Sequence, residues 1–207
     1  LPLLKLAVIA ALCLTIGLCG SRGGTMISIL DGFSKRLAII KQVGTANRFE
    51  EINGENKLDF TAVYDKKAAE YINENNMIEL DDDYFDIVYY HKAQNQDGTL
   101  TIDVQSEHVS YRLNNEDYNL KTFAATGTPA EVFAQILSGT PFSVGVVEFA
   151  DSVTYAISEE KSRRAMVMEF ISMLGGEANF NKFEISIVQH RGSTERKLVT
   201  KGKNIKI

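Results

Sequence analysis

Three stretches between Val104 and Ile207 decide how this chain folds, namely EHVSYRLN at residues 107–114, GTPF at residues 139–142, and LGGEANFNKF at residues 174–183, which GKN follows at residues 202–204. Gly139 can take the left-handed conformation that ends a helix, and Pro141 prevents the helix from continuing. The pair Gly175-Gly176 is suited to end a second helix. Both places therefore predict a change from helix to strand.

The residues before Gly139 carry the start signals of a helix. Thr128 suits the N-cap position, Pro129 suits the first helical position, and Glu131 completes a capping box. The apolar face that follows is made of Val132, Phe133, Ile136 and Leu137. A largely apolar strand is predicted next, at Phe142–Phe149.

A second helix is predicted to begin at Ser158, whose hydroxyl can cap it while Glu159 and Glu160 complement the positive end of the helix dipole. Its apolar side is made of Met166, Phe170, Met173 and Leu174. Methionines at helical spacing fill a core more often than they form a binding surface, so we interpret this side as core.

After Gly176 the pattern favours strands. Glu177–Phe180 and Phe183–His190 predict a hairpin joined at Asn181-Lys182, and Arg196–Thr200 predicts a third antiparallel strand.

The chain from Met26 onward is mostly β by its apolar runs and alternation. The predicted strands are Ile27–Leu30, Leu37–Gln42, Leu58–Tyr64, Met77–Leu80, Tyr84–Tyr90, Leu100–Gln105 and Val109–Leu113. Lys66–Asn75 predicts one short helix, because Ala68 and Ala69 each share a face with Ile72. The fold class that follows is α+β and β-rich.

The quoted stretches resemble, in order, blocks of the form E-H-I-S-Y-x-L, T-P-F, G-G-E-x-x-F-D-x-F and G-K-N. These blocks belong to the N-terminal region of phage minor structural proteins, also called antireceptors or tail-associated lysins, of siphophage tail tips. The resemblance covers roughly residues 26–207 and is looser before Lys57. Asn181 stands where the family pattern has aspartate, which matters little in a turn.

The resemblance implies barrel-like antiparallel β subdomains with short packed helices, similar to the hub of a phage baseplate. It also implies a homotrimer that closes the tail tube and binds the distal tail protein and the tape measure protein. C-terminal modules, missing from this chain, would carry a peptidoglycan hydrolase or bind the host cell surface. The expected location is the virion tail tip, assembled in the bacterial cytoplasm.

Residues 1–25 differ from the rest of the chain. Lys5 precedes an apolar run from Leu6 to Cys19 that is shorter than the roughly 20 residues of a membrane span. No stable membrane insertion is therefore expected. We interpret residues 1–25 as an apolar leader outside the fold, either a start assigned upstream of Met26 or a real signal. Residues 26–207 then form the tail-tip region, with 26–105 and 106–207 as subdomains, truncated at the C-terminus.

Composition excludes several kinds of site. The two cysteines, Cys13 and Cys19, both lie in the leader, so a disulfide framework or thiolate site downstream is excluded. A net charge of -5 argues against specific nucleic-acid binding. The sequence contains neither a Gly-x-Ser-x-Gly elbow nor a P-loop. We expect no catalytic, cofactor-binding or metal residues and no cofactor.

The histidines and clustered acids have structural interpretations. His91, His108 and His190 lack the spacing of a zinc site. His108 lies in the family-like block with Tyr111, where strand alternation separates it from Glu107, so we expect a hydrogen-bonded structural histidine. Asp81-Asp82-Asp83 lacks calcium-loop spacing and is interpreted as a solvated hairpin turn.

Charge is unevenly distributed along the chain. Seven acidic residues and no Lys or Arg lie between Ala68 and Asp86, whereas Lys182–Ile207 holds seven basic residues and two acidic ones. Two solvated faces are one interpretation. The other is that these faces meet between subunits of a ring, so that assembly is sensitive to salt.

The sequence thus favours a structural component of a phage or prophage tail tip that is not an enzyme within this chain. The alternative is an exported cell-surface binding protein with a genuine signal peptide. An endopeptidase would require a nucleophile or metal site that the sequence does not offer.

Overall fold

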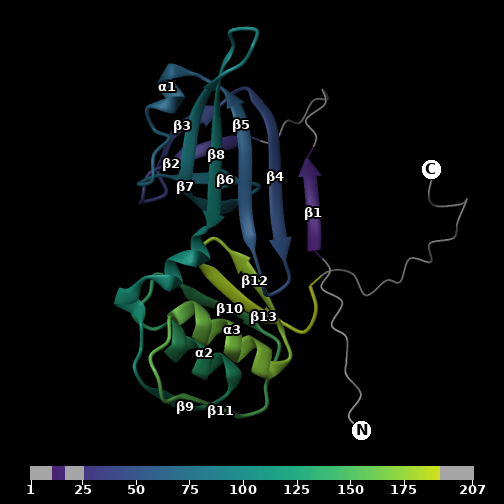
Figure 1. Ribbon diagram of the computed structural model, residues 1–207. Helices are drawn as coiled ribbons and strands as arrows, with labels where there is room; N and C mark the ends of the chain where they lie inside the picture. Colours follow the sequence, from purple (N-terminus) through teal and green to yellow (C-terminus); the bar gives the residue numbers. More distant parts are fainter. Residues whose placement is uncertain (1–10, 17–25, 192–207) are drawn as a thin grey trace, which may run out of the picture.

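The computed structural model describes residues 11–16 and 26–191, which form an upper and a lower subdomain stacked end to end (Figure 1). The upper subdomain runs to the end of β8 and contains one sheet with a short helix. The lower subdomain contains two small sheets and two longer helices (Figure 1). Each subdomain has an apolar cluster, and the cluster of the lower subdomain also includes Leu30 and Met77 of the upper one.

The upper subdomain is built on an eight-stranded antiparallel sheet in the order β1-β4-β5-β8-β7-β6-β2-β3. Its strands are β1 (Ala11–Ile16), β2 (Ile27–Leu30), β3 (Arg36–Ile40), β4 (Val43–Glu51), β5 (Asn56–Val63), β6 (Met77–Leu80), β7 (Asp83–Gln94) and β8 (Leu100–His108). Among the described residues β1 and β3 have one neighbour each, so the sheet is open and does not close into the barrel that the resemblance implied.

Strand alternation determines which face of this sheet is buried. Leu58, Phe60 and Ala62 of β5 point into the core, as do Ile102 and Val104 of β8. The residues between them are polar and partly exposed, and two of these, Thr61 and Asp103, share a 2.6 Å hydrogen bond. The alternation of apolar and polar residues in the sequence therefore gives a sheet with one apolar face.

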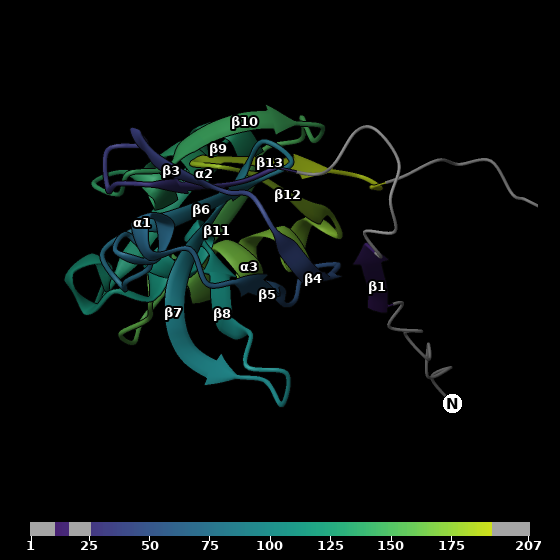
Figure 2. The ribbon, with the colours of Figure 1, turned by 90° about the horizontal axis from the view of Figure 1, so that it is seen from above.

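Strand β7 continues past the core. Its pairing with β6 ends at Asp86, and its register with β8 shifts between Ile87 and Tyr89, which marks a bulge at Val88. Beyond the bulge β7 and β8 curl away as a projecting hairpin (Figure 2). The strand predicted at Tyr84–Tyr90 is thus confirmed, and the observed strand β7 is longer than predicted.

The predicted helix at Lys66–Asn75 is shorter, because α1 covers only Lys66–Ala69. Asp65 caps it, and Ala68 and Ile72 are buried as their spacing predicts. The asparagines that follow bond to the local backbone instead of continuing the helix, since Asn76 donates to the Tyr71 carbonyl.

The lower subdomain contains the remaining elements. They are η1 (Val109–Asn114), η2 (Glu116–Tyr118), β9 (Phe123–Gly127), α2 (Pro129–Leu137), β10 (Ser143–Val147), β11 (Val153–Ile157), α3 (Arg163–Leu174), β12 (Glu177–Asn181) and β13 (Glu184–Val188). Strand β13 pairs parallel with β10 and antiparallel with β12, and β9 pairs with β11. Helices α2 and α3 pack through Phe133 and Phe170, whose ring centroids are 5.9 Å apart.

Helix α2 confirms the start and stop signals in the sequence. Thr128 and Glu131 form the predicted capping box, with Pro129 in the first turn. Gly139 takes a left-handed φ of 78° just beyond the helix, and Pro141 precedes the strand β10. Local sequence chemistry alone thus predicted both ends of this helix, and its buried apolar face packs into the core.

Helix α3 begins later than predicted. Ser162, not Ser158, caps it by accepting a 3.2 Å hydrogen bond from the Ala165 N–H. The reason is that β11 and the loop after it occupy the preceding residues, and β11 pairs with β9. Its predicted end is correct, with Gly175 left-handed at φ 68°. Met166 and Phe170 are buried, whereas Met173 is half exposed.

The remaining strand predictions have mixed outcomes. The strand predicted at Val109–Leu113 is wrong, since these residues form the 3-10 helix η1, which His108 caps through its side chain. Strands β4, β9 and β11 were not predicted. The predicted hairpin after Gly176 is confirmed as β12 and β13, with Lys182 as its left-handed residue at φ 53°. The strand predicted at Arg196–Thr200 lies outside the described residues.

Part of the predicted leader is described. Residues 11–16 form β1, which pairs antiparallel with β4 from Ala11 opposite Glu51 to Ile16 opposite Ala46. The rest of residues 1–25 lies outside the described part, and the leader interpretation stays a prediction.

We predict that Thr128→Ala lowers the free energy of unfolding by about 1 kcal/mol, because it removes the N-cap of α2. Urea denaturation measures this loss. Thr122→Ala is the matched control, since Thr122 is exposed and makes no side-chain hydrogen bond among the described residues. Equal losses in both variants would contradict the role of the cap.

Candidate functional site at the joint between the subdomains

A buried carboxylate, Asp83, lies where the two subdomains meet. It follows Asp81 and Asp82, which turn the chain with left-handed φ angles of 49° and 63°. One oxygen of Asp83 accepts hydrogen bonds from His108 Nε2 at 2.9 Å, Tyr84 N at 3.0 Å and Lys182 N at 3.0 Å. The other accepts from Arg48 Nη2 at 2.7 Å. Asp83 thus connects β4, β7 and β8 with the β12–β13 turn.

This position corrects the interpretation of the three adjacent acids. Asp81 and Asp82 are exposed in a hairpin turn as predicted, but Asp83 is only 5% exposed. Asp83 begins β7 and alternates with Phe85 and Ile87, so its side chain points to the buried face of the sheet. The solvated interpretation is therefore wrong for the third aspartate.

His108 is fully buried beside Asp83. Its Nδ1 accepts a 3.1 Å hydrogen bond from the Ser110 N–H, so the ring proton is assigned to Nε2, which donates to Asp83. The ring packs edge-on against Phe85 and against Phe180 of the lower subdomain, with centroids 5.7 and 5.6 Å apart. The prediction of a hydrogen-bonded structural histidine is confirmed.

Arg164, at the start of α3, forms a second connection between the subdomains. Its guanidinium lies 3.9 Å from the ring centroid of Tyr111 and donates to Ser110 Oγ at 2.9 Å. It also donates to the Gly54 carbonyl of the upper subdomain at 3.2 Å. Burial lowers the pKa of this guanidinium from its ordinary value. Tyr111, singled out in the sequence, thus serves as the surface on which Arg164 stacks.

Asn53 joins the β4–β5 turn to the lower subdomain. Its amide donates to the Gly176 carbonyl at 2.9 Å, and its carbonyl oxygen accepts from the Ala178 N–H at 2.7 Å. A Cβ on Gly176 would lie 2.9 Å from the Phe149 ring and 3.0 Å from Ile187, so glycine permits the close packing of these two lower-subdomain side chains beside the joint.

Two ion pairs border the joint. Arg112 donates to both oxygens of Asp86 at 2.8 and 2.6 Å and lies over the Phe183 ring. Arg191 pairs with Glu50 of β4. The joint is therefore a polar and aromatic interface in which each subdomain supplies both donors and acceptors.

The charge state of Asp83 depends on its neighbours. Burial alone would raise the pKa of this carboxyl, but hydrogen bonds from His108 and the Lys182 N–H and the charge of Arg48 outweigh it. The pKa of Asp83 therefore lies below its ordinary value. The carboxylate is held ionised, as a structural acceptor rather than a proton donor.

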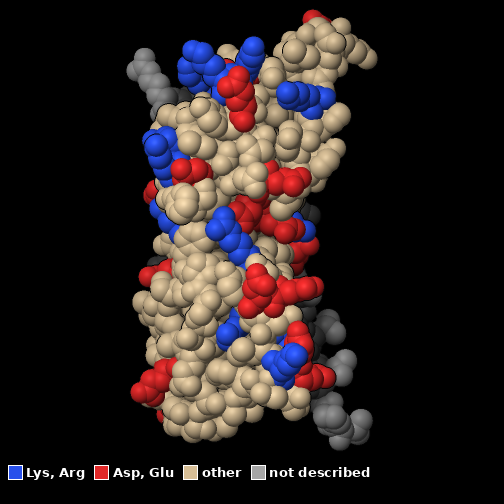
Figure 3. All heavy atoms as spheres, turned by 90° about the vertical axis from the view of Figure 1, so that its left-hand side faces the viewer, with Lys and Arg blue, Asp and Glu red and all other residues tan. Residues whose placement is uncertain are grey.

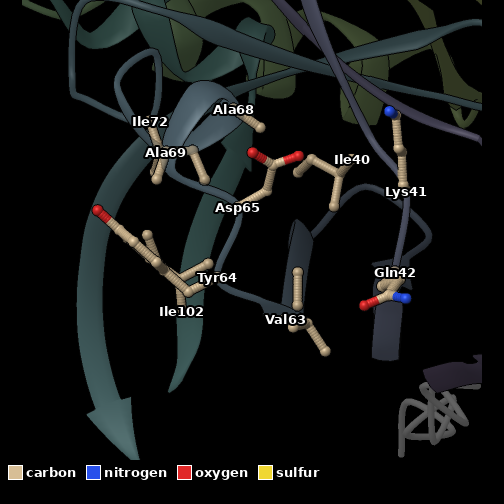
Figure 4. Close-up of a pocket in the computed structure, with 11 residues that line it drawn as sticks. Ile40, Lys41, Gln42, Val63, Tyr64, Asp65, Ala68, Ala69, Ile72 and Ile102 are labelled. Carbon is tan, nitrogen blue, oxygen red and sulfur yellow. The ribbon is translucent and has the colours of Figure 1, made fainter. Parts of the chain in front are cut away.

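A separate pocket of about 260 Å³ opens at the far end of the upper subdomain. Side chains from the ends of β3 and β5 and from α1 converge on it (Figure 4). Its walls are mostly aliphatic, with Lys41 and Asp65 as its charged lining residues. It holds no arrangement of nucleophile and base.

The other residues considered from the sequence are dispersed. His91 is exposed on β7, and His190 is exposed near Glu177. Within residues 11–16 and 26–191 no group of three or more His, Cys, Asp or Glu side chains is arranged to hold a metal ion. Over the same residues, no helix combines the length and apolar character that crossing a membrane requires.

Sequence reasoning missed Arg48, Asn53 and Arg164. The Asn53-Gly54 dipeptide is a strong hairpin signal that could have located β4 and, with it, Arg48. Arg164 offers no local signal, because its partners Ser110 and Gly54 lie 54 and 110 positions away in the chain.

Residues 27–108 match the family model described as the prophage endopeptidase tail N-terminal domain. The match runs from the start of β2 to the end of β8. It confirms the resemblance to phage tail proteins. No curated protein matches the chain in sequence.

Two solved structures have a similar fold. The prophage tail protein gp18 from Listeria monocytogenes EGD-e is 10% identical with a TM-score of 0.62, and the tail protein from Neisseria meningitidis MC58 is 10% identical with a TM-score of 0.53. Each comparison covers 80% of this chain and 50% of the other chain. This chain thus spans about half of each tail protein.

We predict that Asp83→Asn lowers the free energy of unfolding by roughly 3 kcal/mol, because it leaves Arg48 and the His108 N–H without their buried anionic partner. Chemical denaturation measures the loss. Asp82→Asn is the control: its side chain is exposed, asparagine tolerates its left-handed backbone, and its effect should stay within about 0.5 kcal/mol. Similar losses in the two variants would refute the buried role of Asp83.

We also predict that the stability difference between the native chain and Asp83→Asn depends on pH. Because the pKa of Asp83 is lowered in the folded state, its contribution is fully present above about pH 5. It should shrink as the pH falls below about 4 and through the folded pKa. Denaturation midpoints between pH 7 and pH 3 measure this, and a constant difference would contradict it.

Proposed function

We propose, from the match of residues 27–108 to the prophage endopeptidase tail N-terminal domain, that this chain is a structural component of a phage tail. The match to that family is the observation that carries the proposal. The fold shared with two tail proteins supports it at the level of architecture.

Within the tail we place the chain in the hub at the tail tip. There it would close the tail tube as a homotrimer and bind the distal tail protein and the tape measure protein. The joint is compatible with a structural role, since Asp83 and Arg164 connect the subdomains through partly buried hydrogen bonds. In this proposal the open sheets of three copies together make the barrel-like hub.

We assign hydrolase or receptor-binding activity to modules outside this chain. The chain spans half of each similar tail protein, which leaves room for such modules in proteins of that length. His108 itself is unsuited to acid–base chemistry, because both of its ring nitrogens have structural partners.

The proposal predicts a trimer in solution. Light scattering on a sizing column should give three times the 23.0 kDa chain mass, or a stable complex when the distal tail protein encoded nearby is added. A salt series tests the ring interface, because paired acidic and basic faces should separate as ionic strength rises. The hub proposal would be contradicted if the chain stayed monomeric and did not bind the distal tail protein at any salt concentration.

A further inference from the structure

The end of the upper subdomain farthest from the joint combines a pocket with exposed apolar side chains. The buried floor of the pocket is formed by Ile40, Ala62, Ala68, Ile72 and Ile102. Its volume of about 260 Å³ exceeds the roughly 150 Å³ of a cavity that accepts benzene, so one bulky apolar side chain fits.

Four large apolar side chains are exposed at this same end. Val63 lines the pocket and is 39% exposed, and Tyr71, Tyr90 and Leu100 are 38%, 40% and 49% exposed. They come from β5, the segment after α1, β7 and β8, which meet at the top of Figure 1. Apolar groups gathered beside a pocket mark an interaction site more often than scattered ones do.

Lysines surround this apolar area. Lys41 lines the pocket, and Lys66 and Lys67 lie on α1. None of these three forms an ion pair with a described residue. Lys92 lies 4.7 Å from the centre of the Tyr64 ring. Figure 3 shows basic side chains at the upper end of the face that carries α1, with acidic side chains between them.

Two carboxylates at this end accept hydrogen bonds from the backbone. Asp65, which lines the pocket, accepts the Lys67 N–H at 2.9 Å as the cap of α1. Asp97 accepts the Thr99 N–H at 2.9 Å in the hairpin tip, and Glu70 follows α1. Because the ion pairs of lysines in the described part of the chain involve Lys57 and Lys161, Lys41, Lys66 and Lys67 remain available to an incoming anion.

We propose that this end of the upper subdomain is a docking surface for a protein segment that presents one bulky apolar side chain flanked by carboxylates. The apolar side chain enters the pocket and loses water, which supplies most of the affinity. The flanking carboxylates face Lys41, Lys66 and Lys67, which orients the segment. The surface is separate from the joint and does not depend on the tail-tip assignment.

A defined peptide tests this surface. Acetyl-Asp-Asp-Phe-Asp-Asp-amide is titrated into the ¹⁵N-labelled full chain, and amide shifts are followed by NMR. We expect shifts confined to the ends of β3 and β5, α1 and the start of β8. Peptides with alanine for phenylalanine, or lysine for aspartate, should bind more weakly or not at all.

Two variants test the lysine contacts and the apolar pocket separately. Lys66→Glu with Lys67→Glu should weaken binding about fivefold or more, since two favourable charge contacts are reversed. Ala69→Leu should fill the pocket and abolish binding while the remaining spectrum stays native. Lys35→Glu is the control, because Lys35 is also exposed but lies in the β2–β3 turn.

Several results would overturn the proposal. They are the absence of shifts at millimolar peptide, shifts that map elsewhere, equal binding of the three peptides, or equal binding by the α1 variant and the control. Stronger binding of a single-stranded DNA oligonucleotide at the same residues would also overturn it, by assigning the lysines to a different class of partner.

Discussion

The rest of this structure depends on one buried anion. The Asp83 carboxylate lies almost out of solvent and has four donors, three from the upper subdomain and one from the β12–β13 turn below. An unpaired carboxylate at this depth would cost several kcal/mol. Every element that supplies a donor is therefore held in register with the others. His108 donates to this carboxylate through Nε2, because the Ser110 N–H donates to its Nδ1, and the His108 ring also packs against Phe180 of the lower subdomain.

The joint and the opposite end of the upper subdomain differ in their chemistry. At the joint, polar groups are paired across the subdomains. At the opposite end, apolar and basic groups face solvent around a pocket. The family match at residues 27–108 covers the part of the chain that carries the pocket.

A structural feature could be predicted from the sequence where the interacting residues are close together in the chain. Thr128 and Gly175 were predicted because caps and left-handed residues act within one turn. Ser158 was taken for a cap because nothing local reveals that β11 pairs with β9. Asp83 looked like one of three solvated acids, since burial of a charge depends on partners that only the fold brings near. Arg164 was missed for the same reason.

The most direct test of the central claim is native-state hydrogen exchange across the two subdomains. If the joint makes them one cooperative unit, the slowest amides of β5 and β8 and those of β13 and α3 will share one opening free energy in the native chain. The two sets will separate when Asp83 is replaced by asparagine. Two different opening free energies in the native chain would contradict the claim that Asp83 locks the subdomains together.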